Sequence, residues 1–250
     1  SPYVSMGNNP VQFVDFLGDT TYVFSGVTGP YVGMTDLDKK GQRGLIKTSI
    51  EIIIAGDKVT KNTMEYFNFN DPKIDSKAIR NGKINRLEVV SKDLVFKQLF
   101  RSGVLSPENE GIGYARKEGV AGGKMDYAIQ GYYAGDLDNK TLYYVTSAVD
   151  GQPGSVAYNF GDFGNYLFGR GIGELGISPG IAKAGAHYNN IFNAYLRSTD
   201  YTPLYDMGPG TYADPGFFDS PADQAAITRG AYLRWSQYLQ NTDLTLPITP

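Results

Sequence analysis

The alternation of apolar and polar residues divides the chain into a strand-forming first part and a largely helix-forming second part. Between residues 20 and 70, short runs of β-branched and aromatic residues are separated by turn-forming Gly, Pro, Asp and Asn. Because such runs favour extended backbone, we expect a small antiparallel meander in this region. Its predicted strands cover residues 21–24, 31–35, 48–55 and 64–69.

Helical spacing of apolar residues begins after residue 74. Asp75 or Ser76 is expected to cap a first helix, and the β-branched stretch 87–90 interrupts the helical pattern. A second helix is predicted for residues 92–101. Gly103 is its expected end, because glycine readily adopts the left-handed backbone conformation that closes helices.

Beyond residue 111 the pattern predicts two strands, at 122–127 and 141–145, and then mainly helices. Helical spacing covers residues 161–177 and 181–196. The predicted fold class is therefore α+β, with an antiparallel β-rich N-terminal part followed by a mainly helical C-terminal half.

The last predicted helix has a strong start signal. Ser220 stands at the capping position, Pro221 at the first helical position and Asp223 two positions later, and we expect the helix to end near residue 239. The Pro- and Gly-rich stretch 200–220 before it is expected to be a long loop. Loops of this length in compact domains are usually mobile or functional.

Composition narrows the possible chemistry. The 250-residue chain has no cysteine, so it forms no disulfide. Its single histidine argues against a zinc site, because such sites usually use several His or Cys ligands. Its formal net charge of −3 argues against a partner held by phosphate neutralisation. No run approaches the roughly 18 apolar residues of a membrane span, so we expect no stable membrane insertion. No metal and no cofactor is expected.

The densest glycine content lies in residues 161–177, which also hold Asp162, Asn165 and Arg170. Glycine weakens a helix by about 1 kcal/mol relative to alanine, so this density indicates close approach of the backbone to another segment or to a ligand. His187, ten residues after this stretch, is the only side chain in the chain whose ordinary pKa suits proton transfer near neutral pH.

A first family resemblance lies at the N-terminus. Ser1-Pro2-Tyr3 followed by Asn8-Asn9-Pro10 and then Asp15-Phe16-Leu17-Gly18 resembles the closing motif of the core domain in RHS-repeat proteins. In that family the motif separates a β-cocoon shell from a variable C-terminal toxin, and self-cleavage occurs near it. Phe16 departs from the family, which usually has proline at this position.

A second resemblance lies in the C-terminal half. Asp162-Phe163-Gly164-Asn165-Tyr166, the later Ala184-Gly185-Ala186 and the pair Asp223-Gln224 are similar to the polymorphic toxin type 44 domain, over residues 158–232. The two resemblances imply three units: residues 1–19 as the end of an RHS core, 20–105 as an accessory part, and 106–250 as the toxin domain. The turn-forming stretch 106–111 is the predicted linker.

Together these signals give a set of candidate site residues. For each, a structural role is the alternative: Asp162 as a helix cap, Asp223 as an acid favoured by a helix N-terminus, and His187 as a packed side chain. The candidates expected to converge in one cleft are Asp162, His187, Asp223 and Arg170 as catalytic residues, and Asn165, Tyr166, Gln224 and Tyr188 as substrate contacts.

The resemblances imply an antibacterial effector that is secreted or delivered into a target bacterium, with a cognate immunity protein and the RHS shell of its parent protein as partners. A hydrolase of an envelope glycan such as peptidoglycan is the expected activity, because paired carboxylates cleave glycosidic bonds without a cofactor. The alternatives are a metal-independent ribonuclease that uses His187 and Arg170, and a non-enzymatic binding or pore-forming module.

Overall fold

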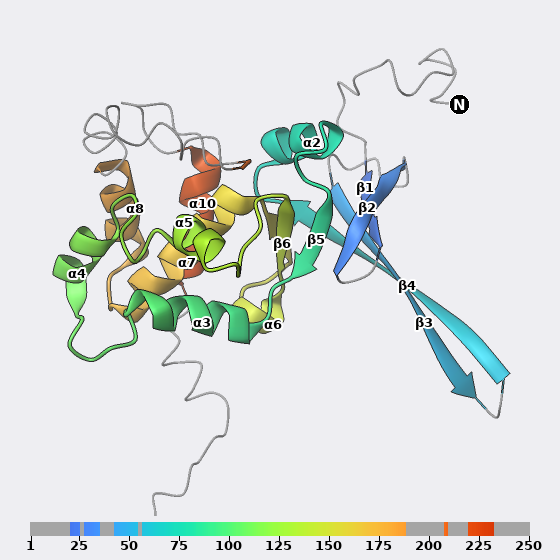
Figure 1. Ribbon diagram of the computed structural model, residues 1–250, viewed down its shortest axis with the longest axis horizontal. Helices are drawn as coiled ribbons and strands as arrows, with labels where there is room; N and C mark the ends of the chain where they lie inside the picture. The colour runs from blue at the N-terminus through green and yellow to red at the C-terminus, as the bar shows by residue number, and fades with distance from the viewer. Residues whose placement is uncertain are drawn as a thin grey trace, which may run out of the picture.

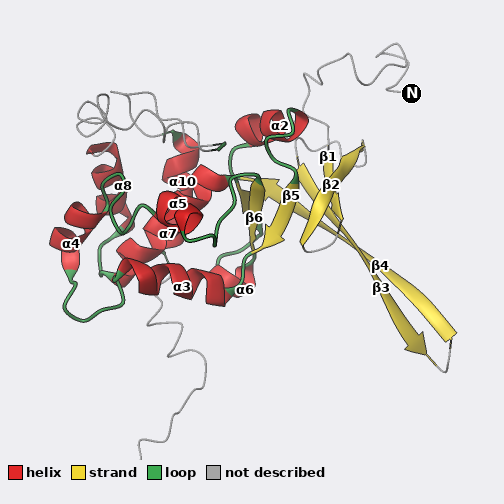
Figure 2. Cartoon of the chain, viewed as in Figure 1, coloured by secondary structure: helices red, strands yellow, loops and turns green. Residues whose placement is uncertain are grey.

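The protein has a mixed α+β fold (Figures 1 and 2). The structure is a computed structural model, and it describes residues 21–25, 28–35, 43–54, 57–188, 208–209 and 220–232. Within these residues there are eight helices and seven strands. Four of the strands precede the first described helix, and the helices dominate from residue 72 onward.

The strands close into one barrel in the order β1-β2-β5-β6-β7-β4-β3. Neighbouring strands are antiparallel except for three parallel pairs, which are β1 with β3, β4 with β7, and β5 with β6. The barrel strands are β1 Thr21–Ser25, β2 Thr28–Thr35, β3 Arg43–Ile54, β4 Asp57–Phe69, β5 Arg86–Val89, β6 Thr141–Val145 and β7 Val156–Tyr158.

This topology corrects the predicted meander. Strands near all four predicted positions are present, but β1 lies between β2 and β3, so β2 and β3 are not neighbours. The chain crosses from β2 over β1 to reach β3, and β3 runs parallel to β1. Beyond Lys47, β3 pairs only with β4, and the two form a long hairpin arm that projects from the body (Figure 1).

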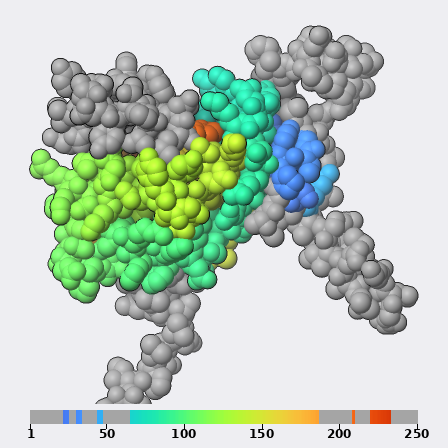
Figure 3. Space-filling model, in the orientation of Figure 1, coloured from blue at the N-terminus to red at the C-terminus, as the bar shows by residue number. Residues whose placement is uncertain are grey.

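Except for α2, which packs on the barrel strands, the helices gather on one side of the barrel, and α7 is their central element (Figure 1). Helices α3, α5, α8 and α10 all pack on it. On the face shown in Figure 3, the segments from α2 to α5 form one continuous surface. The described helices are α2 Pro72–Arg80, α3 Lys92–Ser102, α4 Gly111–Glu118, α5 Tyr127–Tyr133, α6 Ser147–Asp150, α7 Phe160–Glu174, α8 Pro179–Tyr188 and α10 Pro221–Ala231.

Strand β6 separates two apolar cores, and for this reason all five of its residues are buried. Leu142 and Tyr144 belong to a cluster drawn from the barrel strands and α2. Tyr143 and Val145 belong to the cluster between the sheet and the helices. There the Tyr143 ring stacks on Phe163 of α7, with ring centroids 4.4 Å apart. A strand covered on both faces reads as a continuous apolar run, as residues 141–145 do.

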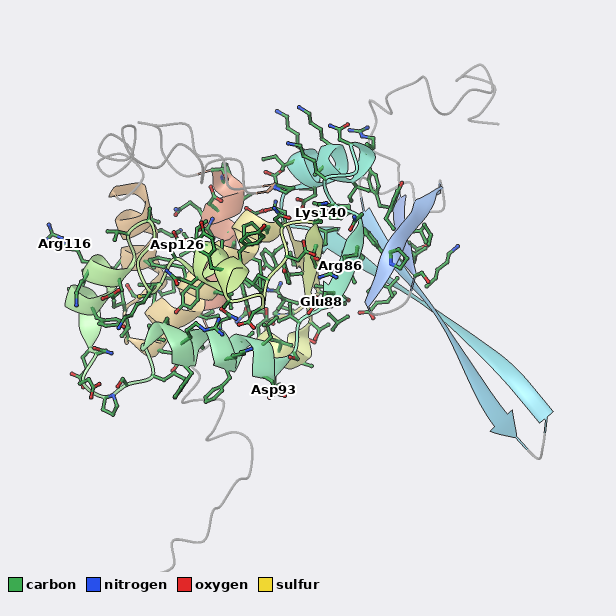
Figure 4. All side chains as sticks on the ribbon, in the orientation of Figure 1. Arg86, Glu88, Asp93, Arg116, Asp126 and Lys140 are labelled. Atoms are coloured by element: carbon green, nitrogen blue, oxygen red, sulfur yellow. The ribbon has the colours of Figure 1, made fainter. Side chains whose placement is uncertain are left out.

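Side-chain contacts also join β5 to β6 across their parallel pairing. The Arg86 guanidinium donates a hydrogen bond to Thr141 Oγ1 at 2.6 Å and lies 3.2 Å from Asp138 (Figure 4). These two strands lie on opposite sides of the predicted 105/106 boundary. One sheet therefore contains strands from both of the predicted units 20–105 and 106–250.

The predicted starts and ends of the helices agree with the structure in some places and not in others. The predicted cap of the first helix is wrong: α2 begins at Pro72 with Asp71 as its cap, so Asp75 and Ser76 lie inside the helix. Gly103 ends α3 in the left-handed conformation, and Ser220 and Asp223 form a reciprocal capping box on α10. The strand predicted at 122–127 is wrong: this stretch forms turns that lead into α5, with Asp126 at the capping position. The predictions for residues 1–19, 189–196 and 233–239 and for most of the 200–220 loop lie outside the described residues.

Candidate active site

The N-termini of helices α2, α7 and α10 and the end of strand β4 meet at one place in the fold. Each helix has a side-chain cap that accepts a hydrogen bond from a backbone N–H of the first turn, as helix starts require. Asn70, the residue that follows β4, donates one hydrogen bond to a group of α7 and one to a group of α10. The capping contacts are Asp71 with the Ile74 N–H at 2.9 Å, Asn159 with the Asp162 N–H at 2.9 Å, and Ser220 with the Asp223 N–H at 3.1 Å.

The side chain of Asp162 lies at the centre of this junction. Its Oδ2 accepts hydrogen bonds from Asn70 Nδ2 at 2.8 Å and from Asn159 Nδ2 at 3.1 Å. The Asn159 amide also donates to Asp75 Oδ1 at 2.8 Å. One buried amide therefore joins the carboxyl groups of Asp75 on α2 and Asp162 on α7.

Asp223 of α10 completes a group of three carboxyls. Its Oδ1 accepts a hydrogen bond from Asn165 Nδ2 at 2.7 Å, and its Oδ2 accepts one from the Ser220 N–H at 3.1 Å. Asn70 joins the two helix starts, because its Nδ2 donates to Asp162 Oδ2 at 2.8 Å and to the Ala222 carbonyl oxygen next to Asp223 at 3.0 Å. Two carboxylates at one buried junction repel each other, which favours the protonated form of either one.

Burial and mutual repulsion favour the protonated forms of all three carboxyls. Burial raises the pKa of Asp75 to about 8. Burial, followed by the nearby charges of Asp75 and Asp223, raises the pKa of Asp162 well above its ordinary value. Burial also raises the pKa of Asp223, although its hydrogen bonds with Ser220, Asp162 and Asn165 oppose the rise. Among the described residues, no Lys or Arg forms an ion pair with any of the three.

The three carboxyls differ in their access to solvent. Asp75 is 0% exposed and Asp162 is 2% exposed, whereas Asp223 is only partly buried. Asp223 is therefore the most exposed of the three carboxyls. A carboxyl that keeps its proton near neutral pH is suited to act as a general acid.

Three of the predicted site residues come together here: Asp162, Asp223 and Asn165. The alternative role predicted for Asp162, as the cap of α7, is wrong, because Asn159 caps this helix and Asp162 lies in its first turn. Asp223 occupies the first turn of α10, as its alternative structural role predicts, and it accepts a hydrogen bond from Asn165.

Arg170 and Tyr166 occupy the interior of the helical layer instead. Arg170 is 0% exposed and follows Asp162 by two turns of α7, about 12 Å along the axis. The Tyr166 ring stacks on Phe163 and packs against Tyr158. Both side chains are enclosed by the packing of α7, so neither faces a substrate in this arrangement.

The remaining predicted residues lie on α8 and α10. His187 and Tyr188 are at the end of α8, and their side chains lie outside what the structure describes. Gln224 lines an open hollow of about 460 Å³. Its other lining residues are Gln152, Pro153, Lys183, Pro221, Ala225, Thr228, Arg229 and Tyr232.

Sequence reasoning missed Asp75, Asn159 and Asn70 as site residues. Asp75 was predicted to cap a helix and Asn70 to follow the end of a strand. These are roles within the nearby sequence, so neither residue was predicted to contact a distant carboxyl. The sequence did carry a signal at Asn159. An asparagine followed three residues later by an acid, here Asp162, is typical of a helix start. Recognising it would have placed α7 correctly.

Within the described part of the chain, no group of three or more His, Asp or Glu side chains is arranged to hold a metal ion. None of the described helices combines the length and the apolarity needed to cross a bilayer. Neither known protein families nor curated protein sequences match this chain, and no solved structure matches its fold. The two resemblances therefore rest on the residues that carry them.

Proposed function

We propose that the chain is a hydrolase in which Asp223 is the general acid and the buried Asp162 at the same junction disfavours its ionisation. The observation that carries this proposal is the junction where the partly exposed Asp223 and the buried Asp162 come together. Asn70 is hydrogen-bonded to Asp162 and to the backbone next to Asp223, and no described Lys or Arg forms an ion pair with either carboxyl. Burial raises the pKa of both carboxyls, and the charge of Asp223 raises that of Asp162 further, so the junction favours a protonated carboxyl.

Glycosidic bonds are the substrate bonds that this arrangement fits best. Cleavage needs a carboxylic acid to protonate the leaving oxygen and a carboxylate to activate water or attack the sugar. Asp71, which is partly exposed and electrostatically coupled to Asp162, is the second carboxylate proposed for this reaction. Asp223 gives its proton to the leaving oxygen, and Asp71 takes a proton from the attacking water.

The family resemblances extend the proposal to a biological setting. They support an effector of the RHS polymorphic type, delivered into a rival bacterium, that attacks an envelope glycan such as peptidoglycan. A cognate immunity protein and the RHS shell are its proposed partners. No particular contact favours the ribonuclease alternative, since Arg170 is enclosed two turns away from the carboxyl pair.

Expression in a test bacterium examines this function. The wild-type chain is expected to be toxic in the periplasm and harmless in the cytoplasm. Asp223→Asn removes the acid while it keeps a side chain that accepts the Ser220 N–H, so we expect a loss of about 10²–10⁴ in rate, and loss of toxicity. Asp71→Asn keeps a good helix cap and is expected to lose activity too.

The control is Asp93→Asn, which changes an exposed aspartate in the first turn of α3, on a different helix (Figure 4). This variant should stay fully toxic. Toxicity confined to the cytoplasm, or full periplasmic toxicity of Asp223→Asn at normal expression, would contradict the proposed function.

A further inference from the structure

The exposed side of helix α2 carries three cations in a row. Lys73, Lys77 and Arg80 are exposed, whereas Asp75, the acidic residue within the helix, is 0% exposed. At about 100° per residue, the three cations fall within an arc of about 60° around the helix axis, and they follow one another at intervals of about 6 and 4.5 Å along it. Lys73, Lys77 and Arg80 therefore form one basic stripe along α2.

Within the described part of the chain, no carboxylate neutralises this stripe. None of the described ion pairs includes Lys73, Lys77 or Arg80. Like charges three or four residues apart on a helix repel each other. The helix dipole favours Lys77 and Arg80 near the end of α2, but it disfavours Lys73 in the first turn. Local helix electrostatics therefore account for only part of the stripe, and an anion bound along it accounts for all three cations.

The stripe begins beside the proposed active site. Asp71, the proposed second carboxylate, caps α2 by accepting the Ile74 N–H at 2.9 Å, and Lys73 lies in the first turn that follows. On the buried side of the helix, Asp75 accepts a hydrogen bond from Asn159 at the junction. Helix α2 thus presents a carboxyl group to the junction and cations to solvent. A chain bound at Asp71 that continues along α2 meets the stripe.

We propose that the basic stripe binds the carboxylate groups of an extended acidic glycan and leads this glycan to the junction at Asp71. This inference deepens the proposed function and rests on it, because it names the class of glycan. Lysine offers a point charge and arginine a planar fork that matches a carboxylate. Positive charge beside a site also raises the local concentration of an anionic substrate. Helix α2 has no aromatic residue on which a base could stack, so single-stranded nucleic acid fits the stripe less well.

Binding of polygalacturonate, an acidic glycan, to the full chain carrying Asp223→Asn tests the inference without turnover. Binding should weaken as salt is added, because a polyanion releases counterions when cations neutralise it. Combining Lys73→Gln, Lys77→Gln and Arg80→Gln should lower the affinity about tenfold to a hundredfold, since three exposed contacts of about two- to fivefold each multiply. The triple variant should also bind with a smaller salt dependence. Glutamine has nearly the helix propensity of lysine and arginine, so α2 should remain helical, which circular dichroism checks.

Arg116→Gln is the matched control for the single change Arg80→Gln. Both are exposed arginines in the last turn of a helix, and Arg116 lies on α4, far from α2 (Figures 1 and 4). Arg80→Gln should weaken binding about two- to fivefold, and Arg116→Gln should leave it unchanged. Equal losses in these two variants, equally tight binding of a neutral chitin oligosaccharide, or tighter binding of a single-stranded oligonucleotide would overturn the inference.

The outcome for the stripe is separate from the outcome for the proposed function. Binding that depends on the stripe, without hydrolysis of an envelope glycan by the wild type, would support the stripe and contradict the hydrolase. Hydrolysis of such a glycan at equal rates by the wild type and the triple variant, at low salt and low substrate concentration, would do the reverse.

Discussion

At the scale of single residues, the buried carboxyl of Asp75 links the stability of the fold to pH. Its pKa is about 8 in the folded protein, against roughly 3.9 in an unfolded chain. Between these two values the folded state binds the proton more tightly than the unfolded state does. Its contribution to stability is therefore complete below pH 4 and is lost as the pH rises through 8.

We predict that Asp75→Asn weakens this pH dependence. Each proton held only by the folded state changes the free energy of unfolding by about 1.4 kcal/mol per pH unit. The unfolding free energy of the wild type minus that of the variant should therefore decrease steadily from pH 4.5 to pH 7.5. Urea unfolding at several pH values measures it, with Asp93→Asn as the control. A difference that stays constant over this range would show that Asp75 ionises normally.

Which residues form the site could be predicted only in part from the sequence. Asp162 and Asp223 each carry a local signal, because both stand in the first turn of a helix with a recognisable start. Their partners carry none. Asn70 is 92 residues away from Asp162, and Asp75 is 84 residues away from Asn159. Contacts at such separation depend on how the helices close around the barrel, which no local pattern encodes.

At the scale of elements, the glycines of α7 allow its neighbours to approach its backbone. A Cβ on Gly169 would lie 2.2 Å from the Ile227 carbonyl oxygen of α10, and one on Gly230 would lie 2.1 Å from the Tyr166 carbonyl oxygen. Helices α7 and α10 thus each carry a glycine, Gly169 and Gly230, where they contact each other. Glycine density predicted a close backbone approach, and the structure identifies other helices as what approaches.

We predict opposite effects for two Gly→Ala changes. Gly169→Ala forces α7 and α10 apart, and overpacking of this kind costs about 1–3 kcal/mol or more. Gly185→Ala lies in α8, where a Cβ meets nothing within 4 Å, so the gain in helix propensity should stabilise the protein by up to about 1 kcal/mol. Thermal unfolding compares the two. Equal melting temperatures for both variants would mean that the crossing adjusts without cost.

At the scale of the whole molecule, the barrel binds together segments that the sequence suggested were separate units. Strands β6 and β7 pair with β5 and β4, and Val95 and Leu99 of α3 belong to the same core as Phe163 of α7. The linker prediction depended on turn-forming residues at 106–111. Such residues mark a surface connection equally well inside one folded unit.

We therefore expect a fragment of residues 106–250 not to fold alone, contrary to what the sequence boundary suggests. The fragment loses the partners of β6 and β7 and exposes the core face of α7. Dispersion of its amide proton NMR signals, compared with that of the full chain, tests this. A well-dispersed spectrum from the fragment would restore the boundary at 105/106.

The backbone of the long β3–β4 hairpin has fewer hydrogen-bonding neighbours than the backbone of the closed barrel. In the closed ring, strands have neighbours on both sides, so few amide groups point to water. Beyond Lys47, the two arms of the hairpin have only each other among the described strands, which leaves a row of amide and carbonyl groups open along each outer edge. Exchange of amide protons with solvent therefore begins on this arm and reaches the ring only through larger openings of the fold.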